Sequence, residues 1–154
     1  MFTPVTLERY LHSHIPLSAD LGARPVVVSL QEVVLEAPLA PNINHRASAF
    51  GGSLTALAIL AAWSWLRVHV DKWPRVPTLV IQRESMDFLA PAEGAFRARC
   101  AAPAAAAVER FDRMLERYRR ARLELQAEVL CEGRTVGRLN GEFVALLAPP
   151  PDFG

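Results

Sequence analysis

The sequence predicts an α+β domain in which a curved, five-stranded antiparallel sheet wraps around one long apolar helix. The helix is expected from Gly52 to about Val70, because this stretch is apolar almost all round and needs other structure to cover it. Strands are expected because apolar and polar side chains alternate elsewhere, most clearly over 122–147. The length of 154 residues fits one domain, expected over 1–148, with a flexible C-terminal tail at 149–154.

The elements before the central helix are short. Residues 6–14 predict a helix with Thr6 as its cap, which Pro16 prevents from continuing. The β-branched residues between Arg24 and Leu35 predict the first strand. Two prolines then place 37–44 in a loop.

Four further strands and one helix are expected after the central helix. Residues 78–89 predict a strand, and residues 96–100 predict another with one solvent-facing side. Apolar side chains recur at helical spacing over 104–118. The last two strands form a hairpin around the turn Glu132-Gly133.

Composition excludes several classes of function. A net charge of +1 gives no reason to expect nucleic acid or an anionic membrane as a partner. The longest apolar run, Leu54 to Leu66, is too short to cross a bilayer. The N-terminus lacks the pattern of a secretory signal, so a cytoplasmic location is expected.

The cysteines and histidines indicate no cofactor. Cys100 and Cys131 fall in strand-like segments, where small buried thiols in a reducing compartment are expected. His12, His14 and His69 lack metal-ligand spacing with cysteine or carboxylate residues. Neither a metal nor another cofactor is therefore expected.

A polar loop leads into two glycines at the start of the central helix. The loop, 41–48, contains amide, imidazole and hydroxyl side chains, and Phe50-Gly51-Gly52-Ser53 follows it. Glycines allow a close backbone approach, and the first turn of a helix leaves N–H groups unpaired. Because the helix dipole is positive there, an oxygen that gains negative charge would be stabilised. This arrangement suits the polarisation of a carbonyl group.

Four stretches, Ala40–His45, Phe50–Leu54, Phe88–Pro91 and Arg119–Arg122, resemble hotdog-fold proteins. Within that fold they resemble the thioesterase family found at the C-terminal end of certain N-acetyltransferase chains, the YiiD C-terminal type, here as a stand-alone version. The resemblance implies a hydrolase that acts on thioesters of coenzyme A or of acyl carrier protein. It also implies a homodimer, or a dimer of dimers, with sheets joined edge to edge and two sites at the interface.

The chain departs from the pattern of this family at three positions. Ala47 stands where such proteins tend to have glycine, and Ser48 where they tend to have threonine. The better-known hotdog thioesterases place a carboxylate in the central helix, where this chain has Ile59. Since 50–70 contains no Asp or Glu, hydrolysis driven by a carboxylate of this helix is excluded.

The resemblance assigns roles to residues around the glycine pair. The Gly52 amide would donate to the oxyanion, and Asn44 would be a second donor or would orient water, unless it only shapes the loop. His45 would be the general base, or else a loop histidine bonded to backbone. Ser53 would bind water or substrate, or else satisfy backbone groups. Phe50 and Gly51 would contact the substrate, Ser48 could equally cap the helix, and Asn42 is interpreted as structural.

Two groups of charged residues have both a functional and a plain interpretation. Arg119, Arg120 and Arg122 could bind the phosphates of coenzyme A, or could belong to a solvated face. Glu84 or Asp87 could reach the site of a partner subunit, or could lie on a solvated strand face.

Two functions compete with hydrolysis. The missing helix carboxylate leaves open a non-catalytic protein that binds acyl thioesters. A dehydratase or hydratase on this fold would need a histidine paired with a carboxylate, and only His45 is suitably placed. Trp63 and Trp65, two residues apart, cannot face the same side of the helix, so one is expected under the sheet and the other at a dimer seam or acyl tunnel.

Overall fold

The computed structural model describes residues 1–148; the expected flexible tail, 149–154, lies outside the described residues. The elements in chain order are α1 (Pro4–His14), α2 (Pro16–Asp20), β1 (Arg24–Val28), β2 (Glu32–Ala37), η1 (Ala40–Asn42), α3 (Gly51–His69), η2 (Val70–Lys72), β3 (Thr78–Phe88), β4 (Phe96–Ala101), α4 (Ala105–Tyr118), β5 (Arg120–Cys131) and β6 (Arg134–Leu146).

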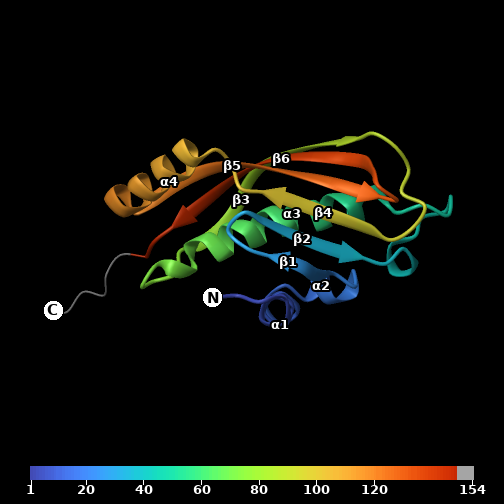
Figure 1. Cartoon of the computed structure of the whole chain (residues 1–154), viewed down its shortest axis with the longest axis horizontal. Helices are drawn as coiled ribbons and strands as arrows, with labels where there is room; N and C mark the ends of the chain where they lie inside the picture. Colours follow the sequence, from blue (N-terminus) through green and yellow to red (C-terminus); the bar gives the residue numbers. More distant parts are fainter. Residues whose placement is uncertain (149–154) are drawn as a thin grey trace.

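A single antiparallel sheet of six strands, in the order β1-β2-β4-β5-β6-β3, curves around α3. Figure 1 shows α3 running along the inside of this sheet, with α1 beside β1 and α4 at the left end of the molecule. Side chains alternate between the core and the solvent along β5, whose inward set includes Leu123 and Leu125. This is the hotdog fold that the resemblance implies.

The expected five strands are six because 24–35 contains a turn. The Ser29 hydroxyl accepts hydrogen bonds from the amides of Gln31 (3.2 Å) and Glu32 (3.1 Å), and the Ser29 amide donates to the Glu32 carbonyl (3.0 Å). These bonds reverse the chain, so β1 and β2 pair with each other. The prediction missed this turn because β-branched residues on both sides of it have a high propensity for strands.

The N-terminal helix starts earlier than predicted. Thr3, rather than Thr6, is its N-cap: the Thr6 amide donates to the Thr3 hydroxyl, and the Thr3 amide donates to the Thr6 hydroxyl. Pro4 takes the first helical position, where its missing N–H costs nothing. The short helix α2, absent from the prediction, follows Ile15.

The core helix α3 ends in a set of paired polar groups. His69 stacks on Trp65 with ring centroids 5.3 Å apart, and its Nε2 lies 2.8 Å from Asp112 of α4. Lys72 donates to the other oxygen of Asp112 at 2.6 Å. Partial burial raises the pKa of the Asp112 carboxyl, but hydrogen bonds from Lys72 and His69 more than offset this, so its pKa lies below the ordinary value. These contacts fix α4 against the end of α3.

Two earlier expectations concern buried groups. Among the described residues one segment, Gly51–Lys72, has the length and composition to cross a membrane, and 78% of its most apolar window is buried inside this domain. Both cysteines are buried and unpaired, as expected. Burial raises the pKa of the Cys100 thiol to about 12, which keeps it protonated and unreactive at neutral pH.

Candidate functional site

The first turn of α3 is open and keeps unused backbone donors. Phe50 is its N-cap in an extended conformation (ψ 133°), and no side chain caps the helix. The amides of Ser53 and Leu54 donate to the Phe50 carbonyl at 2.9 and 3.2 Å. Within the described residues, the amides of Gly51 and Gly52 have no acceptor, so two donors are left where the helix dipole is positive. We call 50–53 the α3 tip.

Two aromatic rings lie against the α3 tip and explain its glycines. A Cβ at Gly52 would lie 2.3 Å from Cε1 of Phe50, and a Cβ at Gly51 would lie 3.3 Å from Cε1 of Phe88. The Phe50 and Phe88 side chains are themselves exposed. The end of β3 therefore forms a wall of the tip. The sequence predicted no role for Phe88, although it belongs to Phe88–Pro91, one of the stretches that carry the family resemblance.

Asn44 organises the loop before the tip. Its Oδ1 accepts from the Arg46 amide (2.8 Å) and the Ser48 amide (3.2 Å), and its Nδ2 donates to the Ser48 hydroxyl at 3.1 Å. A second Nδ2 contact, to the Ala49 carbonyl, is long at 3.5 Å. Asn44 thus shapes the loop and has one amide proton that is poorly used. Ser48 belongs to this network, and the alternative that it caps the helix is wrong.

The loop before the tip contains a residue in a strained backbone conformation. Ala47 has a φ of 58°, in the left-handed region that costs a side-chain-bearing residue about 1–2 kcal/mol. The Asn44 network holds this conformation, because Ala47 sits between the two residues whose amides bond to Asn44.

The remaining predicted residues, His45, Ser53 and Asn42, differ in burial and in hydrogen bonding. His45 is exposed and has no hydrogen-bond or ionic partner among the described residues. Ser53 is buried with 8% exposure, and its hydroxyl donates to no group in the described part of the chain. Asn42 is structural as expected: its Nδ2 donates to the carbonyls of Leu21 and Pro38 at 2.9 and 2.8 Å.

The structure does not bring the predicted phosphate-binding arginines to the tip of the same chain. Phe88, beside the tip, lies at one end of β3, whereas Arg120 pairs with Leu146, the partner of Thr78 at the other end. An eleven-residue strand spans about 33 Å. Arg119 has a φ of 60° and caps the end of α4, with its Nη2 donating to the Ala148 carbonyl. Arg122 lies 3.8 Å from Glu142 on the outer face of the sheet.

The register separates the two candidate carboxylates of β3. Glu84 pairs with Gly141, whose strand neighbours place it on the face towards α3. Asp87 pairs with Arg138 on the outer face. Both side chains are exposed in the single chain, and only Glu84 faces the side on which α3 lies.

The two tryptophans of α3 differ as predicted. Trp65 is buried in the core, and its Nε1 donates to the Leu30 carbonyl at 3.0 Å. Trp63 is half-buried and its Nε1 lies 3.4 Å from the Leu79 carbonyl of β3. Trp63 therefore reaches the side of the molecule where β3 forms the edge of the sheet.

Comparisons with known proteins identify the family to which the chain belongs. Residues 5–147 match the model of a family described as "Putative thioesterase (yiiD_Cterm)". The chain belongs to this family. Its fold is similar to that of a protein with unknown function from Chlorobaculum tepidum TLS, at 28% identity and a TM-score of 0.87, covering 95% of this chain and 98% of that chain.

Two further solved structures of the same fold have thioesterase descriptions. One, a "putative thioesterase" from Shewanella oneidensis, is 24% identical with a TM-score of 0.80, covering 93% of this chain and 96% of that one. The other, a thioesterase from Haemophilus influenzae, is 13% identical with a TM-score of 0.76, covering 98% and 96%. The family supports thioester hydrolysis as the general class of reaction, and these neighbours share the fold.

Proposed function

We propose that this protein hydrolyses acyl thioesters of coenzyme A or of acyl carrier protein at the α3 tip. The observation that carries the proposal is the pair of unpartnered amides, Gly51 and Gly52, at the exposed positive end of a buried helix. A thioester carbonyl oxygen gains negative charge as water attacks, and one oxyanion donor contributes about 3–4 kcal/mol to lowering the barrier. The Gly52 amide is the main donor, and the poorly used Nδ2 proton of Asn44 is the second.

The reaction balances without a cofactor. His45 takes a proton from water as the water oxygen bonds to the carbonyl carbon, and the Ser53 hydroxyl orients that water. When the tetrahedral intermediate collapses, the carbon–sulfur bond breaks and the sulfur receives the proton from His45. The products are a carboxylic acid and a free thiol. His45 is chosen because no Asp or Glu lies between Glu36 and Asp71.

The assembly in this proposal is a homodimer joined through β3. This strand is an edge of the sheet, has eleven residues without proline, and exposes Val80 by 42% and Phe88 by 57%. A long unpaired edge of this kind is suited to pairing with a second copy. Antiparallel pairing of two β3 strands would bring partner residues to the Phe88 side of each tip.

The test is release of free thiol from a panel of acyl-CoA and acyl-carrier substrates. The proposal expects turnover by the purified protein, and a loss in kcat of about 100-fold or more in Asn44→Ala and in His45→Ala. Arg46→Ala, which changes an exposed side chain of the same loop, is the matched control. A folded protein that hydrolyses none of these substrates contradicts the proposal.

A second candidate is a non-catalytic protein that binds acyl thioesters. It is favoured by Ile59, which stands in the helix where a catalytic carboxylate would otherwise be. It is also favoured because no group within residues 1–148 forms a hydrogen bond that would orient His45. Calorimetry with a non-hydrolysable acyl-CoA analogue separates the two. Tight binding without any turnover of the matching thioester would support this candidate.

A further inference from the structure

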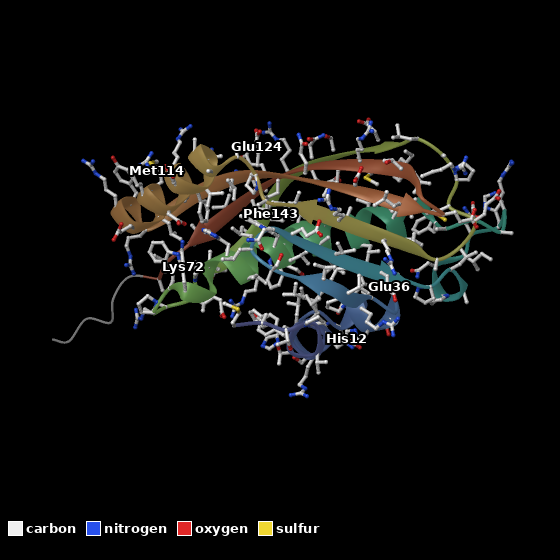
Figure 2. All side chains as sticks on the ribbon, viewed as in Figure 1. His12, Glu36, Lys72, Met114, Glu124 and Phe143 are labelled. Atoms are coloured by element: carbon white, nitrogen blue, oxygen red, sulfur yellow. The ribbon has the colours of Figure 1, made fainter. Side chains whose placement is uncertain are left out.

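The exposed side of α4 has an apolar strip between arginines. Met114 and Tyr118, one turn apart, expose 38% and 56% of their surface. Arg113 and Arg117 lie beside this strip on the helix, and Arg120 lies across from it at the start of β5. Figure 2 shows Met114 on α4 at the end of the molecule, away from the loops at the opposite end. We call Arg110, Arg113, Met114, Arg117, Tyr118, Arg119 and Arg120 the α4 patch.

Two hollows adjoin the strip. One, of about 750 Å³, lies between α4 and the outer face of β5 and is lined by Arg110, Met114, Tyr118 and Arg120 among others. The second, of about 590 Å³, lies on α4 itself and is lined by residues that include Arg113 and Met114. Met114 and Tyr118 line both hollows, so apolar side chains of a partner would have a recess on each side of the strip.

The arginines of the patch have no carboxylate partners within the described residues. Some arginines elsewhere on the chain are paired, as Arg24 and Arg97 are with Glu36, whereas five arginines without an ion pair in residues 1–148 lie together in the patch. In the patch, the Arg117 guanidinium stacks on the Tyr118 ring at 5.3 Å, and Arg119 binds a carbonyl. Among the nearby acids, Asp112 is bound by Lys72 and His69, and Glu142 by Arg122, while Glu109 and Glu116 of α4 form no ion pair within the described residues. With a net charge of +1 for the whole chain, this positive charge is local.

We propose that the α4 patch docks an acidic amphipathic helix of a partner protein. The apolar side chains of such a helix would pack on Met114 and Tyr118, and carboxylates on its two flanks would pair with the arginines. Glu116 lines the smaller hollow, and Glu124 and Glu142 line the larger one, so acidic side chains interrupt the positive surface. A longer phosphate chain or a flat lipid surface would meet these acids. The patch lies at the end of the molecule opposite the α3 tip, and the proposal does not rest on thioester hydrolysis (Figure 1).

The test uses a fluorescent synthetic peptide of about 18 residues, with leucines along one helical face and glutamates on both flanks, titrated with the full chain. We expect Arg113→Glu/Arg117→Glu to weaken binding by about tenfold or more, because two attractive pairs become repulsive. The control Arg9→Glu/Arg134→Glu makes the same charge change at exposed arginines elsewhere, and its dissociation constant should stay within about twofold. Met114→Ala, which keeps every charge, should weaken binding about threefold or more.

Several results would overturn the proposal. A scrambled peptide of equal charge that binds as tightly, or full affinity in Met114→Ala, would reduce the effect to general charge attraction. Phosphatidylglycerol vesicles or single-stranded DNA that bind more tightly than the peptide, with the same arginine dependence, would assign the patch to a membrane or a nucleic acid. If the peptide does not bind and Arg113→Glu/Arg117→Glu changes the mass measured by light scattering, the patch is instead an interface between copies of this chain.

Discussion

The two ends of α3 differ in whether their polar groups have partners within the fold. At the C-terminal end, His69 and Lys72 both bind Asp112, and Arg67 pairs with Asp71 at 3.1 Å. At the N-terminal end, the amides of Gly51 and Gly52 have no acceptor within the described residues. The same helix therefore has one end where charged side chains form ion pairs within the fold and one end where two backbone donors are available to a ligand.

This difference indicates where stability and chemistry are expected to separate. Nineteen helical residues place the ends about 28 Å apart, so a change at one end should leave contacts at the other unaltered. Changes at the C-terminal end should lower stability with little effect on turnover. Changes at the tip should lower turnover with little effect on stability. This expectation is wrong if substitutions at the two ends of α3 have the same effects on stability and on turnover.

The largest effect is expected from Gly52→Ala. The new Cβ would lie 2.3 Å from the Phe50 ring, which must then rotate and alter access to the two free amides. We expect kcat/KM for the preferred thioester to fall by about 100-fold or more. The melting temperature should change little, because both residues are exposed.

Gly94→Ala is the matched control for Gly52→Ala. Its Cβ would have its nearest contact at 3.4 Å, with the flexible end of Glu132, and would contact neither the Phe50 nor the Phe88 ring within 4 Å. Its kinetics should equal those of the unmodified chain. Normal turnover in Gly52→Ala would show that the tip is not the site of the reaction.

A smaller effect, on stability, is expected from Asp112→Ala at the other end of α3. The variant leaves the buried His69 ring without its partner and removes the ion pair with Lys72, which is largely exposed and adds little. The free energy of unfolding should fall by about 1–2 kcal/mol in urea denaturation. Asp20→Ala, at an exposed carboxylate without a described partner, is the control. Loss of turnover in folded Asp112→Ala would mean that the two ends are coupled.

Low pH should lower the stability of the protein by protonating Asp112, which binds the C-terminal end of α3. Because the folded-state pKa of Asp112 lies below its unfolded value of about 3.9, its stabilising effect is present above that value and is lost as the pH falls through the folded pKa. The free energy of unfolding should therefore decline from about pH 5 downwards, and less steeply in Asp112→Ala. Identical slopes for the two proteins would assign the acid sensitivity to other carboxylates, such as Glu36, whose pKa is lowered by Arg24.

Most of the fold could be predicted because long periodic segments dominate it. The predicted bounds of α3 and β3 differ from the observed ones by about one residue, since an all-apolar helix and alternating strands have distinctive patterns. The turn at Ser29 and the cap at Thr3 were missed, because each depends on side-chain hydrogen bonds within a few residues.

The site could be predicted only in part. The glycine pair and the polar loop are contiguous in sequence, and the structure places both at the start of α3. Phe88 and Arg120 are positioned by the antiparallel register of β3, β5 and β6, which a single sequence does not specify. The wall formed by Phe88 and the distance of the arginines from the tip therefore emerged only with the pairing of the strands.

The smallest effect is expected from Ala47→Gly. This substitution tests whether the loop 41–48 holds the α3 tip in place. Glycine removes the cost of the left-handed φ of 58° but gives the unfolded chain more freedom, so the net gain in stability should be at most about 1 kcal/mol. The Asn44 hydrogen bonds can form with either residue, because they use backbone amides and Ser48. Turnover should thus stay within about twofold while the melting temperature rises slightly. A loss of stability in Ala47→Gly would mean that the left-handed turn is not strained, and that the stiffness of alanine helps to keep the loop against the tip.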